Sequence, residues 1–363
     1  MLVGIRIVLV TALLLTVSVP SPAEELPLFQ QDEILKAVLT GPISQAYAQK
    51  GQKARIYHPG QWSYIDENGE SARLDVSIRA RGNFRRMYCD LAPLQLNFKK
   101  SQVKGTLFAG QNKVKLVAPC FDTPSFQRYV LLEYVAYRIL EILTDHSYRT
   151  RLIRLSYVDS DENLKPWTSV VFVIEDDADM AQRLGLERIK VPRVRFDELD
   201  REKTAVAELF QLLIGNNDYS VLKTSAGEDC CHNSDVLAVD EADLKIPIPF
   251  DFDFSGLVDA PYAAPPSHLP IKEVRHRYYT GLCHPVGVLE DAIAHFQSKR
   301  EEIFAFIENL KELSVRGRRD ARYYVENFYD LLDKPKRLEK EVYERCRGRH
   351  LLEAMERRAT DPT

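Results

Sequence analysis

The sequence lacks any long block of like charges, any internal repeat and any low-complexity tract. It carries 49 Lys and Arg against 53 Asp and Glu, a formal net charge of −4, and the two signs are interspersed. This mildly acidic composition does not support nucleic-acid binding, because nucleic-acid-binding proteins concentrate basic residues on one surface. Mixed charges also argue against disorder away from the two ends of the chain.

Two common hydrolase motifs are absent as well. No Ser lies in a Gly-x-Ser-x-Gly setting, and no His-Glu-x-x-His pair occurs. These motifs mark the nucleophile turn of α/β-hydrolases and the zinc site of metalloproteases, so both classes are disfavoured.

The first 23 residues have the pattern of a secretory signal peptide. Arg6 supplies positive charge, Ile7 to Val19 is an apolar or hydroxyl run, and Ser21 to Ala23 are small residues and proline. This run is short for a membrane span, which needs roughly 20 residues. We therefore expect cleavage near Ala23 and a periplasmic or secreted bacterial protein with no stable membrane span; the alternative is an uncleaved N-terminal membrane anchor.

Six cysteines follow, an even number that favours disulfides in an oxidising compartment. They are Cys89, Cys120, Cys230, Cys231, Cys283 and Cys346. Cys89 and Cys120 each end a strand-like segment, which favours a bond between them, and we expect Cys283 to bond to Cys230 or Cys231. A zinc site is disfavoured because only Cys230, Cys231 and His232 cluster, and adjacent ligands rarely complete a tetrahedron.

The hydrophobic periodicity changes along the chain and predicts an α+β fold. Residues 31–39 have helical spacing. Alternating or continuous apolar segments predict strands at 74–78, 94–98, 114–117, 152–158 and 170–174, the last one central in its sheet. Helical patterns cover 125–143, 203–214, 288–310 and 321–332. We divide the chain into a signal peptide (1–23), an approach segment (24–70), a strand-rich lobe (71–190), a helix-rich lobe (191–345) and a charged tail (346–363).

Residues 213–263 concentrate the groups that phosphoryl transfer requires. Asp218 lies in Gly-Asn-Asn-Asp, Asn233 follows 15 positions later, and Asp251 and Asp253 alternate with phenylalanines. A carboxylate can orient an attacking hydroxyl, while an Asn oxygen and a second carboxylate can hold magnesium. The alternatives are purely structural: a turn at Asn216 to Asp218 and a strand with one polar face at 250–254.

These motifs resemble those of the CotH-type family of atypical secreted protein kinases, named for a spore-coat protein. The likeness covers roughly residues 79–329 and includes Arg79-Ala80-Arg81-Gly82-Asn83. It implies a two-lobed, protein-kinase-like fold with ATP and Mg²⁺ (or Mn²⁺) between the lobes. By the same likeness Asp218 is the catalytic-loop residue and Asn233 and Asp251 bind metal, with Asp253 as the alternative metal ligand.

The chain also departs from the kinase pattern. It has no Gly-x-Gly-x-x-Gly loop, so the turn at Arg81 is the candidate for covering the phosphates. Lys113 and Lys115 precede the first long helix, where a kinase keeps its phosphate-binding lysine, and Glu133 in that helix is the expected ion-pair partner. Each lysine also suits a solvent-facing position, and Glu133 an exposed helical one.

The predicted function is that of an exported kinase that transfers the γ-phosphoryl of ATP to a hydroxyl on a protein or small molecule, with Asp218 orienting the acceptor. The alternative is a non-catalytic nucleotide-binding or structural envelope protein. The expected partners are a nucleotide and a hydroxyl-bearing acceptor, such as an envelope or extracellular protein, and not a nucleic acid.

Overall fold

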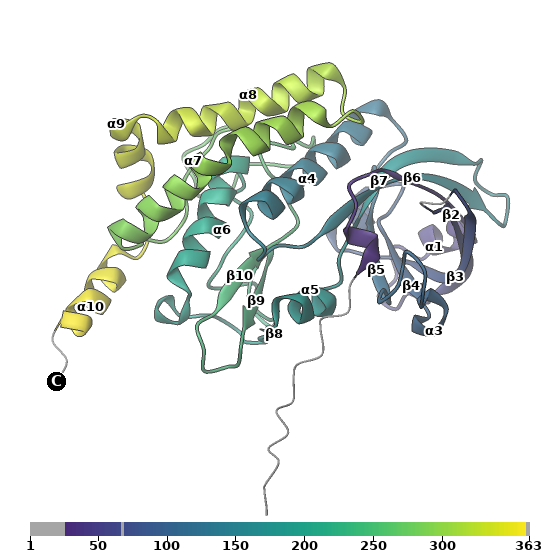
Figure 1. The fold of residues 1–363 in the computed structure, drawn as a ribbon, viewed down its shortest axis with the longest axis horizontal. Coiled ribbons are helices and arrows are strands. Elements are labelled where there is room, and N and C mark those ends of the chain that lie inside the picture. Colours follow the sequence, from purple (N-terminus) through teal and green to yellow (C-terminus); the bar gives the residue numbers. More distant parts are fainter. Residues whose placement is uncertain (1–25, 67–68, 361–363) are drawn as a thin grey trace, which may run out of the picture.

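The computed structural model describes residues 26–66 and 69–360. Its N-terminal part contains the strands β1 (Leu35–Gly41), β2 (His58–Ile65), β3 (Ser71–Ala80), β4 (Leu94–Phe98), β5 (Lys113–Val117), β6 (Thr150–Asp159) and β7 (Trp167–Ile174). They form a closed barrel in the order β1-β2-β3-β4-β5-β7-β6, which fills the right-hand side of Figure 1. Neighbouring strands are antiparallel except β1 and β6, which run parallel.

Strand β1 closes the barrel, and the helix predicted for residues 31–39 is wrong. Leu35, Ala37 and Leu39 are buried, and the residues between them are exposed. A spacing of four residues, as between Leu35 and Leu39, suits one face of a helix as well as one face of a strand. The backbone of β1 pairs with β2 on one side and β6 on the other, so hydrogen bonding to distant segments decides in favour of the strand.

The prediction of a two-lobed, protein-kinase-like fold is also wrong. That fold requires an N-terminal lobe based on an open sheet, whereas here seven strands close on themselves. The physical reason is that the segment before the predicted lobe supplies two strands, β1 and β2. Closure removes both free sheet edges and surrounds a separate apolar core that includes Trp62, Phe98 and Phe108.

Short helices complete the barrel part: η1 (Pro27–Phe29), α1 (Ile43–Ala48), α2 (Phe84–Tyr88) and α3 (Lys100–Val103). The second part contains α4 (Pro124–Leu143), α5 (Asp177–Leu184), η2 (Phe196–Glu198), α6 (Arg201–Ile214), α7 (Val286–Asn309), α8 (Val315–Leu332), α9 (Pro335–Leu338), η3 (Glu339–Tyr343) and α10 (Arg349–Thr360). It also contains a sheet in the order β10-β9-β8, made of β8 (Glu187–Arg188), β9 (Ser234–Ala238) and β10 (Ile246–Pro249). The long helices α7 and α8 cross the upper left of Figure 1.

Helix α4 joins the two parts. The side chain of its N-cap, Thr123, accepts a hydrogen bond from the backbone N–H of Phe126 (3.4 Å), and Pro124 begins the helix. Its Tyr134 and Tyr137 pack on Phe172 of β7, with ring centroids 5.8 and 5.6 Å apart. Burying one such large apolar side chain contributes about 1.5–3 kcal/mol, so α4 is a main source of cohesion between barrel and helices.

The central position predicted for residues 170–174 is confirmed. Val171 and Val173 face the barrel core, while Val170, Phe172 and Ile174 belong to the core of the helical part. A strand buried on both faces needs apolar residues at every position, which explains the continuous run.

The other predicted strands and helices are present, with bounds within a few residues except for the longer starts of β3 and α8. Residues 35–65 of the predicted approach segment form β1, α1 and β2, and the predicted tail includes α10. The predicted signal peptide, residues 1–23, lies outside the described residues. Within residues 26–66 and 69–360, no helix is both long enough and apolar enough to cross a membrane.

Candidate functional site

A cavity of about 660 Å³ lies where the barrel meets the helical part. Its walls come from the segment after β3, from β5 and α4, from the loop before β9, and from the segment after β10. Seven of the residues singled out from the sequence line it: Arg81, Lys115, Glu133, Asp218, Asn233, Asp251 and Asp253. Lys113 is an exposed residue of β5 and is not part of this lining.

Asp218 is held by the end of α6. Gly215 terminates this helix in the left-handed conformation (φ 65°), which a glycine adopts without steric cost. Asn216 is buried, and its Nδ2 donates to Oε1 of Gln211 (2.9 Å) while its Oδ1 accepts from the N–H of Asp218 (2.9 Å). The turn expected from Gly-Asn-Asn-Asp is therefore present, and it presents Asp218 to the cavity.

Both carboxylate oxygens of Asp218 are engaged by residues of the next loop. Asn233 Nδ2 donates to the carbonyl oxygen of Asp218 (2.7 Å) and to Oδ2 (3.1 Å), and Oδ1 is 2.8 Å from His232 Nε2. This hydrogen bond to Asp218 raises the pKa of His232. Since the amide nitrogen of Asn233 faces Asp218, its Oδ1 remains free to accept a ligand, and it has no hydrogen bond from the described residues.

The residues after β10 form a turn, and not the strand that the alternating phenylalanines allowed. Asp251 has a positive φ of 62°, and its N–H donates to the Tyr137 hydroxyl (3.0 Å). Its side chain is exposed in the cavity and makes no hydrogen bond or ion pair with the described part of the chain. Asp253 is buried and accepts from the Tyr262 hydroxyl (2.9 Å), and burial together with the charge of Asp251 raises its pKa well above the usual range.

Glu133 is paired with Arg85, and not with a lysine. Arg85 Nη1 lies 2.8 Å from Glu133 Oε2, its Nη2 donates to the carbonyl oxygen of Ala118 (2.9 Å), and its Nε lies 3.8 Å from Asp253 Oδ2. The side chains of Arg85 and Glu133 are only 10% and 3% exposed. Burial raises the pKa of Glu133 to about 7, against the opposing charge of Arg85.

The two other predicted cations behave differently from each other. Lys115 pairs with Asp177 of α5, which also accepts from the Tyr148 hydroxyl (3.3 Å). Burial opposes the ionisation of Asp177, but the charges of Lys115 and Arg188 prevail and lower its pKa. Arg81, in contrast, forms no side-chain hydrogen bond and no ion pair with the residues that the structure describes. An unpaired guanidinium at the wall of a cavity is a ready partner for an anion.

The donor set of the cavity fits a hard divalent cation. Mg²⁺ and Mn²⁺ prefer oxygen ligands, and Mg²⁺ usually keeps several waters, so the free oxygens of Asn233 and Asp251 are sufficient protein ligands. No group of three or more His, Cys, Asp or Glu residues suited to a metal occurs among the described residues.

Three disulfides occur in the described part of the chain. The predicted bond between Cys89 and Cys120 is confirmed. The predicted partner of Cys283 is wrong: Cys283 is bonded to Cys346, and Cys230 is bonded to Cys231. Neighbouring residues in the chain can pair with each other, which leaves Cys283 to a residue 63 positions away.

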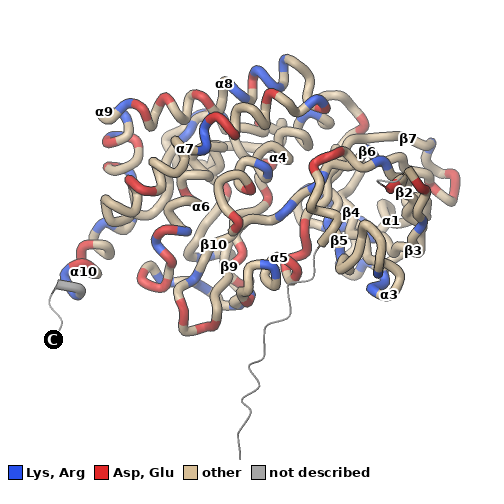
Figure 2. The backbone as a smooth tube through the Cα atoms, in the orientation of Figure 1, with Lys and Arg blue, Asp and Glu red and all other residues tan. Residues whose placement is uncertain are grey.

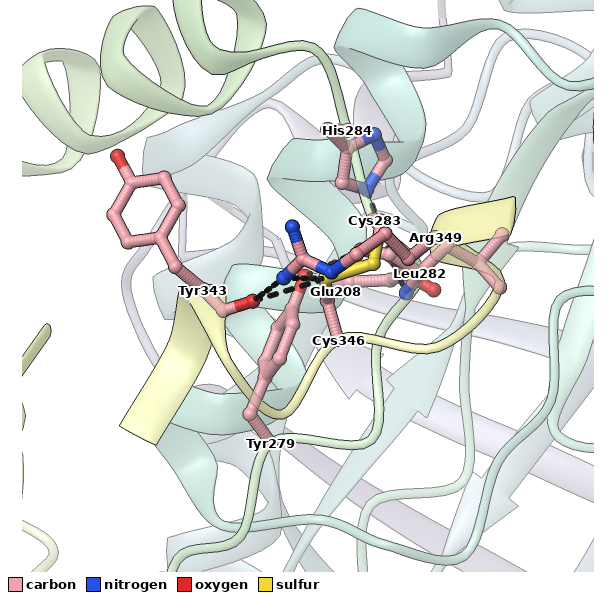
Figure 3. The surroundings of a disulfide bond; sticks show 8 residues. All are labelled: Glu208, Tyr279, Leu282, Cys283, His284, Tyr343, Cys346 and Arg349. Carbon is pink, nitrogen blue, oxygen red and sulfur yellow. Dashed lines mark hydrogen bonds and ion pairs between the residues drawn. A yellow bond between two sulfur atoms is a disulfide. The ribbon is translucent and has the colours of Figure 1, made fainter. Parts of the chain in front are cut away.

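Figure 3 shows the surroundings of the Cys283–Cys346 bond, which fastens the segment before α10 to the loop before α7. Glu208 of α6 accepts from the N–H of Leu282 (2.9 Å) and lies 2.8 Å from His284 Nε2. Both side chains of the Glu208–His284 pair are fully buried. This cluster anchors the loop to α6 and lies outside the cavity lining.

Sequence reasoning missed Arg85 and His232. A signal for Arg85 existed, because it lies four positions after Arg81 and two positions beyond the segment 79–83 already singled out. His232 was considered only as a zinc ligand, although it precedes Asn233 directly. The family models of known proteins include none that matches the chain, and the curated proteins include no match to it.

Proposed function

We propose that the cavity binds ATP with a divalent cation and that the protein transfers the γ-phosphoryl group to a hydroxyl of a second substrate. The observation that carries this proposal is the convergence of Asp218, Asn233 and Asp251 on one cavity beside the Arg85–Glu133 ion pair. These residues come from two loops, one before β9 and one after β10, and turn stabilisation within either loop gives no reason for them to share a cavity.

The proposed metal ligands are the side-chain oxygens of Asn233 and Asp251. When bound, Mg²⁺ or Mn²⁺ would neutralise charge on the phosphates. Asp251 is preferred over Asp253 because its carboxylate is exposed in the cavity and unpaired among the described residues, whereas Asp253 is buried and hydrogen-bonded to Tyr262. The positive φ of Asn233 (50°) and Asp251 (62°) supports a functional demand on both, since such backbone conformations are uncommon in non-glycine residues.

Arg85 and Arg81 are the proposed phosphate-binding cations. Glu133 orients Arg85, as a buried carboxylate does for a cation near a phosphate, and an arginine can donate two parallel hydrogen bonds to one phosphate. Arg81 lines the cavity and forms no side-chain hydrogen bond or ion pair with the described residues, so its guanidinium can make this contact. Lys115 is the less suitable candidate because Asp177 already neutralises it.

Asp218 is proposed to receive the proton of the acceptor hydroxyl. The acceptor oxygen forms a bond to the γ-phosphorus, the bond between that phosphorus and the bridging oxygen of ADP breaks, and the hydroxyl proton passes to the Asp218 carboxylate. ADP and the phosphorylated acceptor are the products. The hydrogen bonds from Asn233 and His232 hold the carboxylate in one orientation, which is the main contribution an enzyme makes to this reaction.

A second function, nucleotide binding without transfer, is favoured by one observation. Both oxygens of Asp218 already take part in hydrogen bonds, so an acceptor hydroxyl has to share the carboxylate with His232 and Asn233. Three disulfides also support a site of action outside the cytoplasm, periplasmic or secreted, where ATP is scarce. Likeness to the CotH-type motifs supports nucleotide binding in either case.

The first test is calorimetric titration of the protein with ATP and Mg²⁺. We expect Asp251→Asn to weaken binding at least tenfold, because a neutral amide is a poor ligand for a hard cation. Asp330→Asn is the matched control, since this carboxylate is 47% exposed on α8. Absence of binding by the folded wild-type protein, or equal binding by both variants, would reject the nucleotide site.

Transfer is tested separately by incubating the protein with Mg²⁺ and ATP labelled at the γ-phosphate. Release of ADP, or labelled protein identified by mass spectrometry, that is lost in Asp218→Asn supports phosphotransfer. Nucleotide binding without either product supports the second function.

A further inference from the structure

A group of cations lies outside the cavity, around α2 and the loop that follows α1. We call Lys50, Arg55, Arg79 and Arg86 the basic rim. None of these side chains lines the cavity. None lies within 4.0 Å of a carboxylate among residues 26–66 and 69–360, whereas about half of the arginines of the helical part have such a partner.

Backbone carbonyl oxygens hold the basic rim in place. The five donor and acceptor pairs are Arg55 Nε with Ala80 (3.0 Å), Arg55 Nη1 with Gln52 (3.0 Å), Arg86 Nε with Gly82 (2.8 Å), Arg86 Nη1 with Lys50, and Lys50 Nζ with Cys89 (2.6 Å). The guanidinium of Arg79 lies over the ring of Tyr57, 4.5 Å from its centroid. A carbonyl oxygen or a ring face satisfies the geometry of a cation without cancelling its charge, so the rim is ordered and positively charged.

The charges of the rim are close enough to repel one another. Burial lowers the pKa of Arg55, and the charges of Arg86 and Arg79 lower it further. The charge of one carboxylate, Asp176, raises the pKa of Tyr57, whose ring lies against Arg79. Within the described part of the chain, Asp176 forms no ion pair with the rim. The chain as a whole has a net charge of −4, and Figure 2 shows basic and acidic residues interspersed along the helices. An uncompensated basic cluster on an acidic protein suits an anionic partner.

Helix α2 adds an apolar surface to the rim. Its residues Phe84, Met87 and Tyr88 are 46%, 58% and 41% exposed. The ring centroid of Phe84 lies 5.3 Å from that of Phe254, and Phe254 lines the cavity together with Asp218. A partner that covers the rim therefore also reaches the mouth of the cavity.

We propose that the basic rim and the exposed face of α2 bind an acidic polypeptide segment that carries apolar side chains among its carboxylates. That this segment belongs to the acceptor, and brings its hydroxyl to Asp218, rests on the proposed function. A polypeptide is favoured over a nucleic acid or a sugar chain because the rings of Phe84 and Tyr88 stack on each other, at 5.4 Å and 16° between planes. Their facing surfaces are therefore not open to a base or a sugar ring.

The test is fluorescence anisotropy with labelled peptides and the full chain, without nucleotide. One probe alternates glutamates with leucines around a single serine; a second replaces every glutamate by lysine; a third is a single-stranded oligothymidine of similar length. We expect the acidic peptide alone to bind, and its affinity to fall as salt rises from about 50 to 300 mM because added ions screen the charges.

Arg55→Gln and Arg86→Gln should each weaken binding of the acidic peptide about three- to tenfold, the usual effect of one charge at an interface. Arg316→Gln on α8, where the side chain is 85% exposed, is the matched control and should leave the affinity unchanged. Circular dichroism and urea unfolding establish that each variant is folded. No binding of the acidic peptide, tighter binding of the oligothymidine, or equal losses in the control would overturn the proposal.

Failure of this proposal can be distinguished from failure of the proposed function. Arg55 lies outside the cavity, so Arg55→Gln should bind ATP and Mg²⁺ as the wild-type protein does. Loss of peptide binding with intact nucleotide binding in the wild-type protein rejects the docking surface alone. Peptide binding that depends on the rim, without nucleotide binding, leaves the docking surface standing and rejects the phosphotransferase.

Discussion

Replacing Glu133 by glutamine should destabilise the protein strongly at pH 8, where Glu133 is ionised, because it leaves a buried cation without its partner. Arg85 is 10% exposed and lies 2.8 Å from the Glu133 carboxylate. Removing one member of a buried ion pair costs about 3–5 kcal/mol. Asp253, 3.8 Å from Arg85 Nε, offers partial compensation, so we expect the lower end of that range, about 3 kcal/mol.

A double-mutant cycle separates the pair from its surroundings. Arg85→Met should cost less at pH 5 than at pH 8, because Glu133 has a pKa of about 7 even with the arginine present and takes up a proton at the lower pH. Arg85→Met with Glu133→Met should recover most of the loss, since two apolar side chains replace two buried charges. The coupling energy is the difference between the double variant and the sum of the two single variants.

The measurement is urea unfolding followed by two signals. Trp62 in β2 and Trp167 in β7 report on the barrel, and circular dichroism reports mainly on the helices; coincident transitions justify a two-state treatment. Arg300 and Asp333 provide the control pair, at 3.0 Å but 28% and 45% exposed, and Asp333→Asn should cost at most about 1 kcal/mol. A loss for Glu133→Gln no larger than this control would refute the reasoning, since it would mean that water in the cavity solvates Arg85.

Three further predictions concern stability away from the cavity. Removal of the Cys283–Cys346 bond should cost about 4 kcal/mol, removal of Cys89–Cys120 slightly less, and removal of Cys230–Cys231 about 1 kcal/mol or less. The reason is that the bonded residues are 63, 31 and 1 positions apart, respectively, and loop-closure entropy grows with loop length. Urea midpoints of the three Cys→Ser double variants test this order of stability losses, and a reversed order would contradict it. Burial raises the pKa of Glu141 from 4.5 to about 7 in the folded state. The unfolding free energy of the wild-type protein should therefore fall by roughly 1–3 kcal/mol relative to that of Glu141→Gln as the pH rises from about 4.5 to 8. Parallel curves of unfolding free energy against pH for the two proteins would show that Glu141 is solvated. Gly215→Ala should cost about 2 kcal/mol or more, because the position has a positive φ and the new methyl group would clash with the Tyr324 hydroxyl. Gly185→Ala, at φ 66° with no neighbour within 4 Å, should cost about 1 kcal/mol. Equal melting temperatures for the two variants would exclude the clash.

The sequence predicted most of the elements that carry the cavity. Residues 94–98 and 125–143 have periodicities that only one kind of element satisfies, and β4 and α4 lie there. The cavity residues could be recognised from the sequence for a similar reason: carboxylates and amides in turns after a helix or strand differ clearly from the apolar segments around them. Asp218, Asn233 and Asp251 were recognised in this way, and the structure brings them to one cavity.

The partners of charged residues were not accessible from sequence. Glu133 was expected to meet a lysine of the preceding strand, but an arginine of α2 occupies the position next to it. Ion pairing depends on which side chains can reach a buried carboxylate. Arg85 and Glu133 are 48 positions apart, so their contact depends on how the folded backbone brings two distant segments together. The same limit applied to Cys283, whose bond to Cys346 depends on how the segment after η3 returns to the loop before α7.

The amino-acid sequence by itself determined the apolar segments, the helix ends at Thr123 and Gly215, and the polar residues available for a site, because these depend on interactions between near neighbours in the chain. Only the tertiary structure decided that β1 is a strand, that the sheet closes into a barrel, and that Arg85 accompanies Glu133. Each of these outcomes depends on hydrogen bonds or charges from distant segments, and a local pattern cannot specify which distant segment supplies them.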